Sequence, residues 1–327
     1  MSNKLIQFLE RNKIYISIAA VSIGLFGYII YVYTLHQPLN SDSSDDNISK
    51  HYNIISPPIA LLACIITFLA FYIQYLANQD IKNQFKVQQF DSLFYEMLKL
   101  HKENVNEIEL EKSSSGVVKG RAAFYQMKIE FEIILDCYRK YNNNLDEDIF
   151  KKAYGSFFWG IYNEANSLDD NLLNELSSFY KIHENDKKEY ALQIKYGQGH
   201  HQFLGHYYRH LYYIAKLVTS NGELSEPQKY HYLKILRAQL SNYEQTMLFY
   251  NWLSGYGKSW EEIEETIDTK ESVNKKYNHF FTKYKMIHNM WHTNLYKDTY
   301  ITHKIDTLKD YYSSISNNNT ELFEIDE

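Results

Sequence analysis

The sequence has few of the residues that interrupt helices. Only four of its 327 residues are proline and twelve are glycine, and three of the prolines (Pro38, Pro57 and Pro58) lie in the first sixty positions. Proline breaks the interior of a helix, and Pro227 is the single proline in the rest of the chain. The sequence therefore predicts an all-α fold.

Cysteine is almost absent. Cys64 lies in an apolar run, and Cys137 is typical of a small core hydrophobe. Two cysteines are too few for a disulfide framework or a cysteine-based zinc site. We expect no cofactor and no resident metal.

An excess of positive charge is also missing, because the formal net charge is −6. Residues 1–78 carry equal numbers of basic and acidic side chains, so the whole of this charge belongs to the rest of the chain. A generic nucleic-acid coat or a polybasic membrane-surface binder has the opposite sign. We therefore expect no generic nucleic-acid binding.

Two long runs contain no charged residue, at 14–35 and 54–76. Each is long enough to cross a bilayer core of roughly 30 Å as a helix. The first is too long for the apolar core of a signal peptide, and no small-residue cleavage site follows it. The second begins with Pro57 and Pro58, which we expect in its first turn. Residues 1–78 are thus predicted to form a two-helix transmembrane hairpin.

The charges that flank these runs predict the topology. The stretch between the runs is polar and acidic, with a single lysine. Basic residues instead precede the first run and follow the second: Lys4, Arg11, Lys13, Lys82 and Lys86. By the positive-inside rule, both termini are cytoplasmic and the loop faces out. The predicted location is the inner membrane, as a multi-pass protein whose first partner is the lipid bilayer.

The first run also has a face of small residues, formed by Ala20, Gly24 and Gly27. Small residues let two membrane helices approach closely. The face fits packing within the hairpin, which we favour, or a homo-oligomer.

Residues 79–316 predict a multi-helix cytoplasmic domain, because apolar residues recur at helical spacing. The expected helices cover 80–108, 120–141, 146–165, 168–183, 199–218, 226–251, 260–267 and 273–295. A loop is expected at 112–116, and no strand-like alternation is apparent. Residues 317–327 form an acidic tail, expected to be frayed.

The most unusual polar residues lie in the central pair of expected helices, 199–251. Ser225, Pro227 and Gln228 are a typical helix start, so the two helices should pack as an antiparallel hairpin. On their faces stand the candidate site residues: His206, Arg209, His210, Arg237 and Glu244.

Three interpretations of this set remain open. It is structural, with an Arg237–Glu244 pair fixing the register of the two helices; or it lines a ligand or partner pocket; or it is a catalytic or metal site. Histidines four residues apart can bind zinc, but no glutamate follows His206 as in HExxH. His288 and His292 repeat this spacing, which chance also produces in a chain with 13 histidines.

Two catalytic motifs fail. The stretch GYGKS at 255–259 resembles the end of a phosphate-binding loop, but Trp252 stands where the first glycine is required. The helical ribonuclease signature, an arginine followed four to six residues later by histidine, is absent as well. These absences favour a non-enzymatic protein over an enzyme.

Several segments together resemble a known family. They are FDSLFYEMLKLHKENVNEI at 90–108, GRAAF at 120–124, FLGHYYRHLYYIAKLV at 203–218 and LKILRAQLSNYEQTMLFYN at 233–251. In this order they resemble the phage abortive infection proteins of the AbiC-like group. The resemblance covers roughly 85–255, and members often carry two N-terminal membrane spans. It implies antiviral defence in which an infected bacterial cell stops growing or dies.

The resemblance and the membrane runs lead to one hypothesis and two alternatives. The first is a membrane-anchored abortive-infection protein whose helical domain senses a signal or partner. The second is a membrane-tethered enzyme with a His/Arg/Glu site for an anionic substrate. The third is a scaffold for a protein or nucleic-acid partner from the same defence operon.

Overall fold

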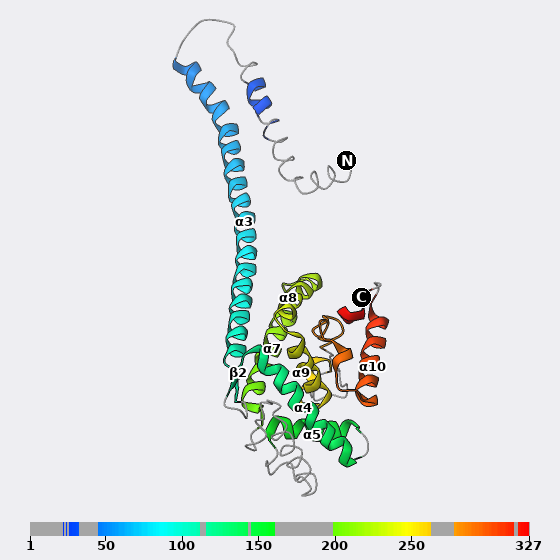
Figure 1. Cartoon of the computed structure of the whole chain (residues 1–327). Coiled ribbons are helices and arrows are strands. Elements are labelled where there is room, and N and C mark those ends of the chain that lie inside the picture. Colours follow the sequence, from blue (N-terminus) through cyan, green and yellow to red (C-terminus); the bar gives the residue numbers. More distant parts are fainter. Residues whose placement is uncertain are drawn as a thin grey trace, which may run out of the picture. The chain divides into compact units, whose positions relative to one another are not determined.

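The structure is a computed structural model that describes residues 22, 24, 26–32, 45–111, 116–142, 145–160, 199–262, 278–316 and 320–326. The chain divides into two compact units, Met1–Asp91 and Ser92–Glu327. Helices make up most of the described residues (Figure 1). This result confirms the predicted all-α class.

The longest helix, α3, spans Asp45–Asn106. Its stretch from Ser56 onward is long and apolar enough to cross a membrane, judged by length and composition alone. None of the most apolar window is buried within the protein. Large hydrophobic side chains of this stretch are instead exposed, for example Phe68 at 71% and Phe71 at 67%.

The bounds of α3 differ from the predicted second span. The helix begins at Asp45, so residues 45–53 are helical where the sequence analysis placed an external loop. Pro57 and Pro58 therefore lie inside the helix and not in its first turn. In the predicted first span, 14–35, the structure describes only residues 22, 24 and 26–32, which are helical. The rest of that span, and with it the hairpin, lies outside the described residues.

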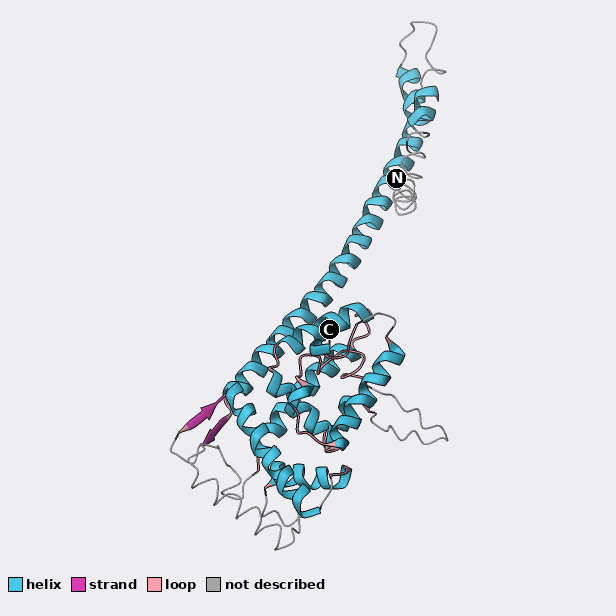
Figure 2. Ribbon diagram, turned by 45° about the vertical axis from the view of Figure 1, so that its right-hand side comes forward, coloured by secondary structure: helices cyan, strands magenta, loops and turns pink. Residues whose placement is uncertain are grey.

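A short hairpin follows α3. Strands β1 (Glu109–Glu111) and β2 (Val117–Lys119) pair antiparallel, as Figure 2 shows in magenta. The sequence analysis missed them, because three residues are too few to show a two-residue alternation. Gly120 then turns the chain with φ of 61° and donates its N–H to the Ile108 carbonyl at 2.8 Å. Glycine adopts such a φ without steric cost.

Helices α4 (Arg121–Asn142) and α5 (Glu147–Trp159) pack on each other and on α9 (Asn242–Leu253). Phe131 lies at the centre of this packing, and its ring meets four other rings at centroid distances of 5.1–5.4 Å: Phe150, Tyr154, Phe157 and Tyr250. These edge and tilted arrangements are favourable for aromatic pairs. The predicted helix at 120–141 is confirmed. The helix predicted at 146–165 begins as expected but ends at Trp159, before Gly160. The predicted helix 168–183 lies outside the described residues.

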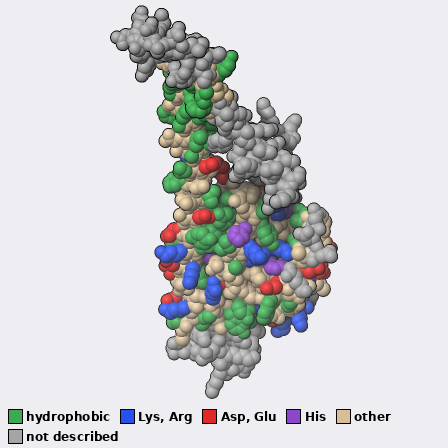
Figure 3. Space-filling view, turned by 90° about the horizontal axis from the view of Figure 1, so that it is seen from above, with side chains coloured by type: hydrophobic (Ala, Val, Ile, Leu, Met, Phe, Trp, Pro, Cys, Tyr) green, Lys and Arg blue, Asp and Glu red, His purple; other side chains and the backbone are tan. Residues whose placement is uncertain are grey.

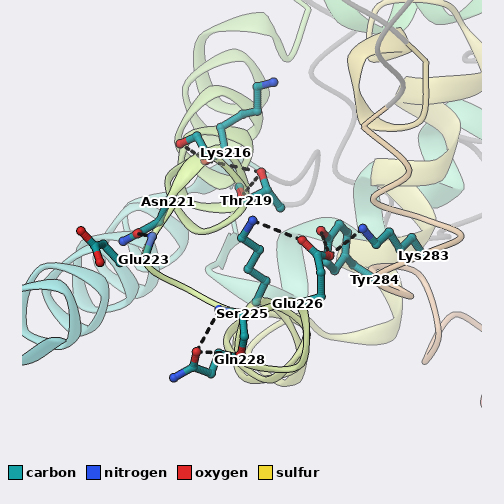
Figure 4. A network of polar contacts seen from close by, with 12 residues as sticks. Lys216, Thr219, Asn221, Glu223, Ser225, Glu226, Gln228, Lys283 and Tyr284 are labelled. Atoms are coloured by element: carbon teal, nitrogen blue, oxygen red, sulfur yellow. Dashed lines mark hydrogen bonds and ion pairs between the residues drawn. The ribbon is translucent and has the colours of Figure 1, made fainter.

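Helix α7 (His201–Ser220) contacts α8 (Glu226–Ala238), and a tight turn joins them. Figure 4 shows this turn, where the Gln228 Oε1 atom accepts the backbone N–H of Ser225 at 2.9 Å. The predicted capping box is therefore present. Beside it, Glu226 accepts from Lys283 at 2.6 Å and from Tyr284 at 3.2 Å, and so ties the start of α8 to a distant segment.

The predicted helix 226–251 is wrong in one respect, because it is two helices. Helix α8 ends at Ala238, and α9 begins at Asn242 after the cap residue Ser241. The Ser241 N–H donates to Glu244 Oε2 at 2.7 Å, and the Glu244 N–H donates to Ser241 Oγ at 3.3 Å. This second capping box satisfies the orphan donors of α9 and makes the break stable.

The predicted helix 273–295 is also wrong. Residues 278–298 form turns and one short 3-10 helix, η3 (His292–Asn294), while 263–277 lie outside the described residues. His279 and Lys285 have positive φ values of 52° and 54°, which no helix accommodates. Regular structure resumes only in α10 (Thr299–Ile315), which Asp298 caps. A further 3-10 turn, η2 (Lys258–Trp260), follows α9.

The acidic tail is not frayed where the structure describes it. In residues 320–326, Leu322 and Phe323 are 1% and 0% exposed, and η4 (Glu324–Asp326) closes the segment. The sequence analysis weighed the charges of this tail and overlooked the two apolar residues among them. Their burial explains the ordered conformation.

Candidate functional site

The two faces of α7 separate the predicted site residues. Its inner face is buried through an apolar and aromatic stripe: Leu204, Tyr207, Tyr208, Leu211, Ile214, Ala215 and Val218. His206 and Arg209 are exposed, and His210 is half-buried. Arg209 donates from Nε to the Gly205 carbonyl of its own helix at 2.9 Å.

Glu244 is the most buried of the predicted residues, at 0% exposure. Besides its capping contact, its carboxylate accepts the Tyr207 hydroxyl at 3.3 Å, and it lies 3.5 Å from Arg121 Nε. Burial raises the pKa of the Glu244 carboxyl, although the contacts with Ser241, Arg121 and Tyr207 oppose this shift. Burial and Glu244 raise the pKa of Tyr207 well above its usual value.

Arg121 connects three helices at this point. It is the first residue of α4, and its side chain is 54% exposed. Its Nη2 donates to the Gln239 carbonyl at the end of α8, while its Nε faces Glu244 in α9. A guanidinium offers several donors in one rigid plane, so a single side chain can hold both helix ends. The sequence analysis did not select Arg121, although it lies in the GRAAF segment.

Glu244, Tyr207 and Arg121 are here named the Glu244 centre, and two histidines lie next to them. His101, from the last part of α3, is 2% exposed and stacks on His210 with a centroid distance of 5.9 Å and an interplanar angle of 4°. The Tyr207 ring also lies near His101, with a centroid distance of 5.0 Å. Burial, followed by the charges of His210 and Arg121, lowers the pKa of His101 to about 4. Within the described part of the chain, neither of its ring nitrogens has a hydrogen-bond partner.

Arg237 contacts the irregular stretch 278–298, which follows α9 and η2 in the sequence. It is 5% exposed, and its Nη1 donates to the Lys285 carbonyl at 2.9 Å. A spacing of seven residues would align the two side chains on one continuous helix. The break between α8 and α9 removes that alignment, and Arg121 is the guanidinium that lies beside Glu244.

Thus the structure links Glu244 to His210 through Tyr207 and His101. Arg237 donates to the Lys285 carbonyl. His206 contributes to lowering the pKa of His210, but its own side chain is exposed.

A second buried pair lies at the start of α7. His200 Nε2 and Glu130 Oε2 are 3.0 Å apart, at 0% and 1% side-chain exposure, and the Phe157 ring lies 4.6 Å from the imidazole. The backbone at Gly199, just before His200, lies very close to the backbone of Phe158. Only glycine fits there, because a Cβ atom would lie 2.1 Å from the Phe158 carbonyl oxygen. The GHH stretch of the sequence therefore begins with a close contact between backbones.

The described residues offer little for a metal. Among them, no three His, Cys, Asp or Glu side chains are grouped so that they could hold a metal ion. What the Glu244 centre provides is a buried carboxylate, a partly exposed guanidinium and a buried neutral histidine. This arrangement can fix helix ends, and Arg121 could also face an anion from solvent.

The chain was compared with known proteins. No curated protein and no solved structure matches it. One family model does match, over residues 199–268, which include α7, α8, α9 and η2. Its description is putative phage abortive infection protein, and it confirms the family resemblance of the sequence on the segment that carries Tyr207, Arg237 and Glu244.

Proposed function

We propose that this protein is a membrane-anchored antiphage defence protein that acts by abortive infection. The family match over residues 199–268 is the observation that carries the proposal. The apolar part of α3 supports the anchor, because its length and composition suit a membrane span. In the proposed topology the protein crosses the inner membrane twice, with both termini in the cytoplasm.

The cytoplasmic helical unit senses an infection signal or a partner, and the membrane segments anchor it or, after several copies assemble, disturb the bilayer. Both apolar runs lack charged residues, which argues against an ion pathway built by one subunit. Membrane damage therefore requires a homo-oligomer. A protein or nucleic-acid partner from the same defence operon is a further part of the proposal.

Infection of cells that express the protein tests this function. We expect growth arrest before phage release, together with loss of membrane potential reported by a voltage-sensitive dye. Unchanged plaque formation would remove the defence function. Growth arrest with an intact potential would remove membrane damage while leaving defence in place.

A membrane-tethered enzyme is the second candidate, favoured by the buried carboxylate of Glu244 beside the partly exposed Arg121. His206→Ala and Glu244→Gln discriminate the two functions, with Tyr213→Phe, at an exposed position of α7, as the control. Loss of defence in a folded, inserted variant supports an enzyme site. Loss of stability alone supports the structural role.

A further inference from the structure

Segment 320–326 packs against the irregular stretch 278–298 and α10, and its Leu322 and Phe323 side chains are buried there. The surface that it contacts, here named the tail groove, consists of Lys285, His288, Asn289, His292, Lys309 and Tyr312. All of these residues contact the segment through polar groups. The contacts of this segment show which groups of the tail groove hold it.

The hydrophobic anchor of the segment is Phe323. Its side chain is 0% exposed, the His292 ring lies 4.8 Å away, and Lys309 Nζ lies 5.6 Å from its ring centroid. Leu322 beside it is 1% exposed. An aromatic side chain in a pocket is the usual energetic centre of a peptide interface.

Backbone groups fix the register. The Glu324 N–H donates to the His288 carbonyl at 2.8 Å, and His288 Nδ1 lies 2.7 Å from the Leu322 carbonyl oxygen. Lys285 Nζ donates to the Glu321 carbonyl. These contacts depend on an extended backbone more than on the identity of the bound side chains.

Charge selects for acidic residues. Lys309 Nζ lies 2.6 Å from Asp326 Oδ2, and His292 Nε2 lies 3.0 Å from Asp326 Oδ1. Asn289 donates to Glu324 Oε2 at 2.5 Å. The hydrogen bonds from Lys309 and His292 lower the pKa of Asp326 against the opposing effect of burial. Figure 3 shows that basic, acidic and histidine side chains are interspersed with hydrophobic ones on the face of the protein seen from above.

Side chains of α8 and α9 form hydrogen bonds with the backbone of the groove residues Lys285 and Asn289. Arg237 donates to the Lys285 carbonyl at 2.9 Å, and Asn242 donates to the Asn289 carbonyl at 3.1 Å. Gln245 Oε1 accepts the Asn289 N–H at 3.0 Å. These supports come from α8 and α9 and do not involve the segment itself.

We propose that the tail groove is a binding site for an acidic peptide of a partner protein, anchored by an aromatic side chain, and that segment 320–326 occupies it in cis as a competitor. The partner peptide has an apolar residue and an aromatic residue followed by acidic residues, as in Leu322–Asp326. Only residues 317–319 separate the segment from Ser316 after α10, so the competitor acts at high local concentration. The proposal concerns binding and stands whether or not the protein acts in defence.

The test uses a fluorescein-labelled peptide with the sequence of residues 320–326, titrated into the full chain in detergent micelles and followed by anisotropy. Phe323→Ala releases the cis segment and leaves the groove intact, so we expect the peptide to bind about tenfold or more tightly than it binds the natural chain. Asp326→Lys weakens the segment at its charged end without emptying the aromatic pocket. It keeps the test valid where Phe323→Ala fails to fold.

Two controls assign the effect to the groove. A peptide with lysine at each acidic position should not bind, and Lys309→Glu added to Phe323→Ala should abolish binding of the natural peptide. The proposal is overturned where both released variants, folded by circular dichroism, bind the peptide no more tightly than the natural chain. The proposal is also overturned if the peptide with lysine at each acidic position binds as tightly as the natural peptide. A dimer in which two copies exchange their 320–326 segments would overturn it as well.

Discussion

The guanidinium of Arg121, in α4, lies 3.5 Å from the carboxylate of Glu244, close to the break between α8 and α9. Glu244 is fully buried, whereas the Arg121 side chain is 54% exposed, so the pair connects the interior to the surface. A buried carboxylate that loses its cation is costly, and solvent reduces the contribution of an exposed cation. The contribution of this pair is therefore measurable but moderate.

Arg121→Gln should reduce the free energy of unfolding by about 1–2 kcal/mol, because Glu244 would lose its cation and Gln239 its donor. For a unit of this size we expect a fall in melting temperature of about 2–6 °C. Arg209→Gln, at an exposed arginine of α7, is the control. The double variant with Glu244→Gln should lose less than the sum of the two single losses, and strict additivity would contradict the pairing.

His101 should make stability depend on pH. Its pKa is about 4 in the folded protein and 6.5 in the unfolded chain, so between these values only the unfolded chain binds the proton. The stabilisation is fully present above pH 6.5 and is lost as the pH falls toward 4, to a total of roughly 3 kcal/mol. Melting temperatures measured from pH 7 to 4 check this.

His101→Phe keeps a ring next to Tyr207 and His210 and cannot bind a proton. It should flatten the pH dependence over this range, whereas Tyr213→Phe, at an exposed position of α7, should leave it unchanged. A pH profile that is identical in His101→Phe and the natural protein would exclude His101 as its source.

Two glycines of the same sequence segment should respond in opposite ways to alanine. Gly199→Ala places a Cβ atom 2.1 Å from the Phe158 carbonyl oxygen, so the backbone must move, at a cost of about 2 kcal/mol or more. At Gly205, inside α7, the nearest atom would be 3.7 Å away. Gly205→Ala should therefore raise stability by up to about 1 kcal/mol. Thermal unfolding compares them, and equal effects would refute the close contact.

Glu226 should contribute a small, salt-dependent stabilisation. The Lys283 contact, with help from Lys229 and Tyr284, lowers the pKa of Glu226 to about 2. The contribution is present above the unfolded value near 4.5 and disappears as the pH falls toward 2. Because the side chain is 55% exposed, Glu226→Gln should cost less than about 1 kcal/mol at pH 7. This cost should shrink in high salt, and a salt-independent cost would point to packing instead.

The sequence predicted those elements whose signals are local. The capping box at Ser225 and Gln228 appears in the structure where it was expected. The Ser241 and Glu244 capping box was equally visible in the sequence, but apolar residues at helical spacing on both sides of it, such as Leu236, Leu240 and Met247, concealed the break. A stripe at helical spacing continues across a break of three residues when both helices face the same core.

The contacts of the candidate site depend on positions far apart in the sequence. His101 and Arg121 reach the Glu244 centre from α3 and α4, more than a hundred residues before it, and no spacing rule connects them. The pairing of Arg237 with Glu244 was predicted from one continuous helix. The structure has two helices there, and Arg237 donates to the Lys285 carbonyl. Segment 320–326 shows the same limit, because its acidic composition says nothing about the basic groove that holds it.

The two prolines inside α3 bear on how deep this helix sits in a bilayer. Pro57 and Pro58 have no N–H to donate, so the carbonyls of residues 53 and 54 lose their usual partners within the helix. Such carbonyls need water, which the hydrocarbon core does not supply. In the proposed topology the outer edge of that core therefore lies close to the prolines. With a rise of 1.5 Å per residue, a thickness of roughly 30 Å then ends just before Asp80 and Lys82, the first charges that follow.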